Sequence, residues 1–130
     1  MCWSDDGKTI WGVLTWIAAS HYNFFSYDCV KNKLNTYNVP YGCKYDYEIN
    51  PNQGTLLYSN YLFIVDADEA DNLIKTETII CLYILDFYTN QQKLITTSKG
   101  KQFNPRWLTN ELIEYDSPIE NKREKMKYKK

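Results

Sequence analysis

Histidines, paired cysteines and glycine-rich loops are what this sequence has least of. His21 is the single histidine in 130 residues, and none of the four cysteines belongs to a Cys-x-x-Cys pair, so the usual zinc-site patterns are absent. Whether any cysteines form a disulfide bond is open at the level of sequence. A Gly-x-Ser-x-Gly elbow and a glycine-rich phosphate loop are missing too. We therefore expect no catalytic residue, no enzyme activity and no cofactor.

An excess of one charge and long apolar runs are also missing. The formal net charge at pH 7 is −1, and the one sustained basic run lies at 122–130. A nucleic-acid-binding domain presents a basic face, so we expect no nucleic-acid partner. The longest apolar stretches, 11–19 and 79–85, are too short and too polar for us to expect membrane insertion, and we expect no signal peptide in the chain as given. We expect the chain as given to stay in the compartment where it is made.

Aromatic residues are what the sequence has in abundance, with 12 tyrosines, 5 phenylalanines and 4 tryptophans. Flat rings and β-branched side chains suit strand surfaces, and short runs rich in them alternate with polar turns from residue 10 to residue 115. No long amphipathic helix interrupts these runs, and strands that follow one another through tight turns pair in antiparallel fashion. The sequence thus predicts an all-β fold of about ten short strands.

One stretch, residues 62–77, departs from the strand pattern and predicts a long loop with room for one helical turn. Its carboxylates at Asp66, Asp68, Glu69 and Asp71 are of the type that calcium prefers. The stretch lacks the central glycine and the closing glutamate of an EF-hand loop. We therefore interpret it as a solvated acidic loop and expect no metal site.

The strands are arranged as an internal repeat. A strand that ends in Asp28 and turns at Asn32 recurs 58 positions later, and a turn that contains glycine at position 7 recurs 47 positions later. Repeats of about 40–50 residues with four short strands each are typical of β-propeller blades. The residues that we assign to repeated structural positions are Trp3, Asp6, Gly7, Asp28, Asn32, Asn50, Pro51, Gly54, Asp86, Asn90, Asn104, Pro105 and Trp107.

These repeated positions predict structural roles rather than a catalytic pair of carboxylates. Asp28 and Asp86 recur at the repeat period, which favours one structural task performed twice, namely capping the turn that follows. Trp3 and Trp107 recur in the same way, and we expect both to pack between blades.

The run Leu82–Asn90, with Lys93–Thr97 and Phe103–Trp107 after it, resembles the TolB-type propeller repeat. In that repeat a strand ends in Asp, a Thr-Gly turn and a Leu-Thr pair follow, and a Pro-x-Trp-Ser-Pro-Asp-Gly-Lys segment comes last. Trp3–Lys8 matches this last segment with one substitution, Asp5 in place of proline. Asn90 replaces the turn glycine, but asparagine also adopts the left-handed conformation that such turns need.

The resemblance implies antiparallel four-stranded blades of a partial TolB-like propeller over residues 1–117. The expected units are a first blade at about 1–38, a second at about 44–97 with the insertion at 62–77, the start of a third at about 102–116, and a charged flexible tail at 118–130. Propellers close with roughly four to eight blades. The chain is therefore expected to be a section of a larger propeller, whether truncated, expressed as a fragment or dependent on partners.

The function implied by the resemblance is that of a non-catalytic protein-interaction scaffold, as in family members that serve as binding platforms in the cell envelope. One alternative is the gating propeller of a prolyl-oligopeptidase-like peptidase without its hydrolase domain. Another is a degenerate remnant without independent activity. Because two terminal blade faces would lack neighbours, we expect self-association or a protein partner at these faces.

Overall fold

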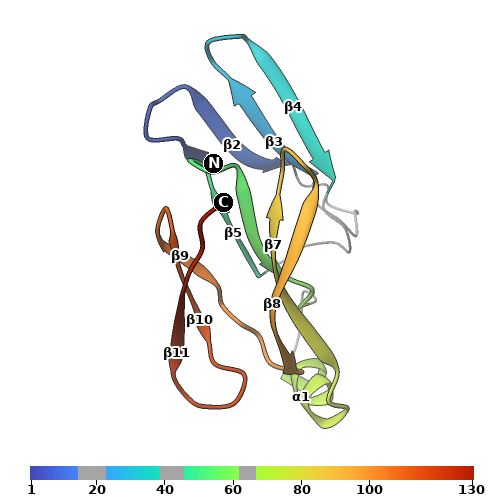
Figure 1. Cartoon of the computed structure of the whole chain (residues 1–130). Coiled ribbons are helices and arrows are strands. Elements are labelled where there is room, and N and C mark those ends of the chain that lie inside the picture. The colour runs from blue at the N-terminus through green and yellow to red at the C-terminus, as the bar shows by residue number, and fades with distance from the viewer. Residues whose placement is uncertain (15–22, 39–45, 62–66) are drawn as a thin grey trace.

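The computed structural model describes residues 1–14, 23–38, 46–61 and 67–130. Within these ranges the chain forms eleven strands and one helix, which confirms the predicted all-β class. The strands build three antiparallel sheets, and in each sheet they are hydrogen-bonded in chain order. Figure 1 shows the first sheet at the top of the view, the third at the lower left and the second between them.

We name the sheets by their order along the chain. The N-terminal sheet consists of β1 (Cys2–Trp3), β2 (Thr9–Leu14), β3 (Asn23–Asp28) and β4 (Lys33–Asn38). The central sheet consists of β5 (Tyr47–Asn50), β6 (Thr55–Ser59), β7 (Ile79–Asp86) and β8 (Gln91–Lys99). The C-terminal sheet consists of β9 (Arg106–Thr109), β10 (Leu112–Asp116) and β11 (Arg123–Lys127), and the helix is α1 (Ala67–Lys75).

The turns between strands repeat in their local chemistry. Asn32 and Asn90 have positive φ angles of 51° and 57°, as a left-handed turn position requires. Asp28 Oδ1 accepts hydrogen bonds from the backbone N–H groups of Val30 and Lys31, both at 3.0 Å. Asp86 Oδ1 accepts one from the N–H of Tyr88 at 2.9 Å. These side chains hold the two strand-to-strand turns that lie 58 positions apart.

Two apolar clusters fill the spaces between the sheets. The first joins the N-terminal and central sheets, and its buried members are Trp11, Phe24, Leu56, Tyr58, Leu85 and Phe87. The second joins the central and C-terminal sheets, and its buried members are Leu57, Tyr61, Ile80, Leu82, Ile84, Phe103, Ile113 and Tyr115. The central sheet is therefore covered on both faces, as the unbroken burial of β6 shows.

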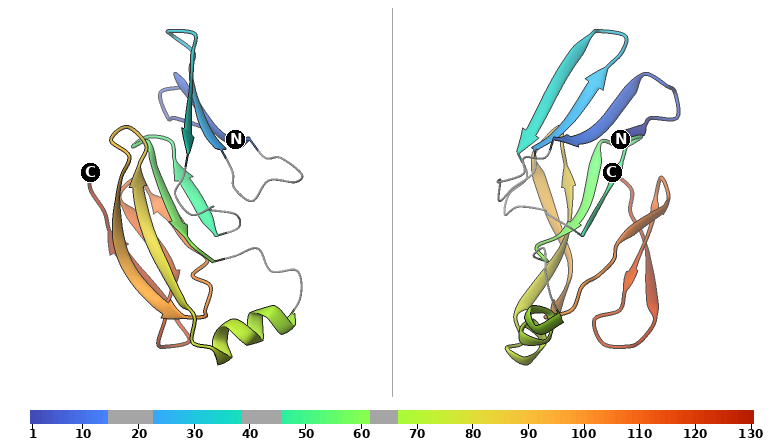
Figure 2. Two further views of the ribbon diagram at one scale, coloured as in Figure 1. Left: turned by 90° about the vertical axis from the view of Figure 1, so that its right-hand side faces the viewer. Right: turned by 180° about the vertical axis from the view of Figure 1, so that it is seen from behind.

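The acidic insertion differs from the predicted loop with one helical turn. Residues 67–75 form a nine-residue helix, α1, at the end of the central sheet where β7 begins and β8 ends (Figures 1 and 2). Asp68 and Glu69 in its first turn and Lys75 in its last complement the helix dipole, and Leu73 packs against the second cluster. The acidic residues favour a loop, but the apolar residues between 67 and 75 have the amphipathic spacing of a helix. No helix in the described part of the chain is long and apolar enough to cross a membrane.

The expected flexible tail at 118–130 is also corrected by the structure. Residues 123–127 form β11, which pairs with β10 along its whole length. The ring of Tyr128 packs edge-on against Trp107, and Lys130 Nζ donates to the carbonyl oxygen of Gln53 at 2.7 Å. A charged sequence becomes a strand here because alternate residues, Met126 and Tyr128, face the second cluster.

Candidate functional site

Equivalent residues in the three sheets can be identified from the strand register. Trp3 lies opposite Ile10, Ile49 lies opposite Leu56, and Trp107 lies opposite Ile113. Each pair joins the first strand of a sheet to its second strand, next to the turn between them. These pairs therefore occupy the same place in each sheet, and their surroundings can be compared directly.

In the central and C-terminal sheets this place is covered by the preceding sheet. Ile49 and Leu56 belong to the first cluster, which packs against the N-terminal sheet. Ile113 is fully buried in the second cluster, against the central sheet. Trp107 donates from its indole Nε1 to the carbonyl oxygen of Glu48 at 3.3 Å and from its backbone N–H to Glu48 Oε2 at 3.0 Å.

The same place in the N-terminal sheet is open to solvent. Trp3, Ile10, Tyr27 and Leu34 form one row across the four strands, on the side away from the central sheet. Trp3 and Leu34 are 56% and 57% exposed, whereas Trp11 on the opposite side is fully buried. Trp3 thus does not pack between described sheets, although Trp107 does. We call this surface the open face.

Phe25 completes the open face one row further along. It pairs with Gly12, and its ring lies so close that a Cβ on Gly12 would be 2.7 Å from it. The glycine lets an aromatic ring lie over the backbone of the neighbouring strand. The open face is therefore a row of apolar side chains with an aromatic ring beside it, of the kind that marks interaction surfaces.

The outer face of the C-terminal sheet is different in kind. Glu114 occupies the register position that Trp11 and Leu57 hold in the other sheets, where both are fully buried. Arg123 bridges Glu114 at 3.3 Å and Asp116 at 2.9 Å. Both terminal faces were expected to lack neighbours and to associate, but this one is charged and internally paired.

Opposing effects act on the pKa of Asp116. Burial by itself raises the pKa of this carboxyl group. Hydrogen bonds from Asn104 Nδ2 at 2.7 Å and from Arg123, together with the charge of Arg123, lower it further than burial raises it. The net effect is a pKa below the ordinary value, so Asp116 is a stable anion at neutral pH.

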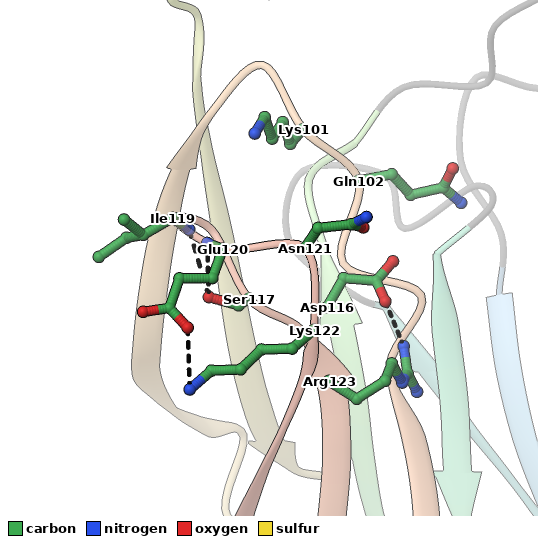
Figure 3. A pocket seen from close by; sticks show the side chains of 9 residues that line it. All are labelled: Lys101, Gln102, Asp116, Ser117, Ile119, Glu120, Asn121, Lys122 and Arg123. Carbon is green, nitrogen blue, oxygen red and sulfur yellow. Dashed lines mark hydrogen bonds and ion pairs between the residues drawn. The ribbon is translucent and has the colours of Figure 1, made fainter.

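A solvent-open cavity of about 590 Å³ lies beside this network, between the β10–β11 turn and the segment that precedes β9. Its lining consists of Lys101, Gln102, Asp116, Ser117, Ile119, Glu120, Asn121, Lys122 and Arg123. Figure 3 shows Arg123 directed at Asp116 and Lys122 at Glu120, the latter pair at 2.9 Å. The charges of the cavity mostly satisfy one another, so its chemistry does not favour a particular ligand.

The first turns of the three sheets are linked to one another. The backbone N–H of Asp5 donates to Asn52 Oδ1 at 2.7 Å, and Asn52 Nδ2 donates to Asn110 Oδ1 at 2.6 Å. Asn50 Nδ2 donates to the carbonyl oxygen of Asn110 at 3.0 Å. This turn ladder links the β1–β2, β5–β6 and β9–β10 turns and ties each sheet to the next.

Other residues at the predicted repeat positions lie in turns or next to strand ends. Asp6 Oδ1 accepts from the hydroxyl of Ser4 at 2.6 Å and from the N–H of Lys8 at 2.9 Å, in the turn where Gly7 has a φ of +69°. The corresponding turn at Pro51 contains Gly54 with a φ of +66°. Pro105 is buried just before β9.

The structure does not gather the acidic candidates into a site. Asp68, Glu69 and Asp71 lie exposed on α1, and Asp66 falls outside the described residues, as does His21. No cluster of three metal-ligating side chains occurs among the described residues.

Cysteine chemistry does not point to a reactive site in the described part of the chain. Cys2, Cys29 and Cys81 are free thiols, and Cys43 falls outside the described residues. Burial raises the pKa of the Cys2 thiol, which disfavours its nucleophilic thiolate form.

Asp46 is an important residue that the sequence reasoning missed. Its side chain is 2% exposed, and it accepts hydrogen bonds from Ser59 Oγ at 2.7 Å and from the N–H groups of Phe103 and Asn104, both at 3.1 Å. It thereby ties the start of the central sheet to the segment that enters the C-terminal sheet. No local pattern in the sequence marks it, because two of its hydrogen-bond donors lie 57 and 58 positions away.

Comparison with known protein families and with curated proteins finds no match for this chain.

Proposed function

We propose that this chain is a non-catalytic protein-interaction scaffold, a section of a TolB-like β-propeller whose contact surface is the open face. The propeller assignment is supported by three successive antiparallel meander sheets, in which residues at equivalent register positions form the two contacts between neighbouring sheets. It is supported further by the turn ladder, which connects the first turns of all three sheets.

A single observation carries the proposed contact surface. A neighbouring sheet covers the equivalent positions in the central sheet (Ile49 and Leu56) and in the C-terminal sheet (Trp107 and Ile113). No described sheet covers their equivalents in the N-terminal sheet, Trp3 and Ile10. A surface that is apolar, contiguous and repeated elsewhere as an interface is suited to bind a protein. The described part of the chain contains no cluster of three metal-ligating side chains that would favour a metal site instead.

Site-specific photo-crosslinking tests the proposal. A photoreactive phenylalanine analogue replaces Leu34 on the open face, and a matched variant carries it at Leu108, which is 44% exposed on the C-terminal sheet. In cells that express the chain, we expect a crosslinked product of defined mass at position 34 and none at position 108. Mass spectrometry then identifies what is attached. Equal labelling at both positions, or none at position 34, would contradict the proposed contact surface.

A further inference from the structure

We propose that the open face binds a second copy of this chain, so that two N-terminal sheets pack face to face about a two-fold axis. This inference rests on the proposed function, because it names the partner of the same surface. A face-to-face pair of this kind is a β-sandwich divided between two chains.

Head-to-tail stacking of copies is excluded by the charged outer face of the C-terminal sheet. Such stacking would place Trp3 and Leu34 of one copy against Glu114, Asp116 and Arg123 of the next. Burying that network against apolar rings would desolvate its charges without adding partners. Among the described sheets, one terminal face is apolar and the other is charged, which leaves a closed, isologous dimer rather than an open filament.

The apolar rows of two open faces fit one another when the faces meet about a two-fold axis. The row runs Trp3, Ile10, Tyr27, Leu34 across the strands from β1 to β4. A two-fold axis along the strand direction, between β2 and β3, places Trp3 of one copy over Leu34 of the other. These are the two side chains of the row that stand more than half exposed, and each would cover the other.

The turns at one end of the sheet are complementary in charge. The β1–β2 turn carries Asp5, Asp6 and Lys8, a net charge of −1, and the β3–β4 turn with its flanks carries Asp28, Lys31 and Lys33, a net charge of +1. Both lie at the same end, because Thr9 pairs with Asp28 and Asp28 with Lys33. The same two-fold axis places the acidic turn of each copy opposite the basic turn of the other.

Analytical ultracentrifugation of the full chain gives the first test. We expect the mass to rise from one chain to two with concentration up to about 200 µM and then to stop. Trp3→Ser and Leu34→Ser should each weaken the dimer at least about tenfold, while Leu108→Ser leaves it unchanged. Circular dichroism establishes that each variant is folded. Growth beyond two chains, or a dimer that tolerates both substitutions, would overturn the proposal.

Charge reversal gives a sharper test of the axis. Asp5→Lys makes both turns positive, and Lys31→Asp makes both negative, so each variant alone should dimerise more weakly than the wild type. A mixture restores opposite charges at both contacts. Native mass spectrometry, with one variant isotopically labelled, should show mixed dimers in excess over either homodimer. A statistical mixture would refute the proposed axis.

The two proposals can fail separately. A chain that stays monomeric while position 34 crosslinks to a different protein overturns the second-copy inference and leaves the scaffold function intact. A monomer without any crosslink at position 34 overturns both.

Discussion

Replacing Asp46 with alanine should strongly destabilise the junction between the central and C-terminal sheets. The substitution removes the acceptor of four hydrogen bonds at a site that is 2% exposed, the fourth being a longer one from Gln102 Nε2 at 3.4 Å. It leaves the hydroxyl of Ser59 and the N–H groups of Phe103 and Asn104 without that acceptor. Each orphaned buried group costs about 1–3 kcal/mol, and relief from burying a carboxylate offsets part of the sum. We expect the free energy of unfolding to fall by about 3 kcal/mol.

The size of this effect is measurable because small domains have only about 5–15 kcal/mol of stability. Urea unfolding followed by tryptophan fluorescence reports it directly, with the unfolding slope compared to ensure that the transition stays two-state. Asp46→Asn keeps one oxygen and the shape of the side chain, so it should cost about 1–2 kcal/mol. Asp71→Ala, an exposed aspartate on α1, is the control and should change stability by less than about 0.5 kcal/mol. A loss of less than about 1 kcal/mol in Asp46→Ala would refute the proposed tie between the sheets.

Three further outcomes follow from features described above. Trp107→Phe should destabilise the chain by about 1–2 kcal/mol, because it removes an indole hydrogen bond and interface packing. Trp3→Phe at the equivalent position should cost under about 0.5 kcal/mol in the same urea assay, because Trp3 is 56% exposed. Equal losses would contradict the conclusion that a neighbouring sheet covers Trp107 and leaves Trp3 uncovered. Gly7→Ala places a side chain in open space at a positive φ and should cost about 1 kcal/mol. Gly100→Ala also brings a Cβ to 2.3 Å from a backbone oxygen of α1, so its melting temperature should be several degrees lower than that of Gly7→Ala. A lower melting temperature for Gly7→Ala than for Gly100→Ala would be inconsistent with the position of the helix. The pKa of Asp116 is lower in the folded state, so this carboxylate contributes to folding stability above the ordinary pKa of about 4, and the contribution is lost as the pH falls through the folded value. Asp116→Asn should therefore flatten the acid limb of a stability–pH profile by less than about 1 kcal/mol. An unchanged acid limb would show that the ion pair with Arg123 is not formed in solution.

The turns and the sheet order were predictable because their causes are local. Asn32, Asn90 and Gly7 adopt positive φ angles for reasons contained in the residues themselves. The repeated aspartates bond to N–H groups two or three positions away, so sequence spacing suffices to place them. Antiparallel order follows when tight turns join successive strands.

The rest depends on contacts that sequence spacing does not contain. β11 is a strand because β10 lies beside it, and its own alternating charges gave no such signal. Asp46 matters through bonds to residues 57 and 58 positions away. Trp3 and Trp107 follow the same sequence pattern, and only the presence or absence of a neighbouring sheet makes one exposed and the other an interface residue.

The turn ladder joins the three sheets through groups that carry no charge. Its links join a backbone N–H to the amide of Asn52, and that amide to Asn110, so none of the bonding groups gains or loses a proton in the ordinary pH range. Mobile ions weaken attraction between charged groups far more than they weaken contacts between neutral dipoles. The part of the contact between neighbouring sheets that the ladder supplies is therefore insensitive to pH and ionic strength, whereas the carboxylate contacts of Asp46 and Glu48 between the central and C-terminal sheets are not.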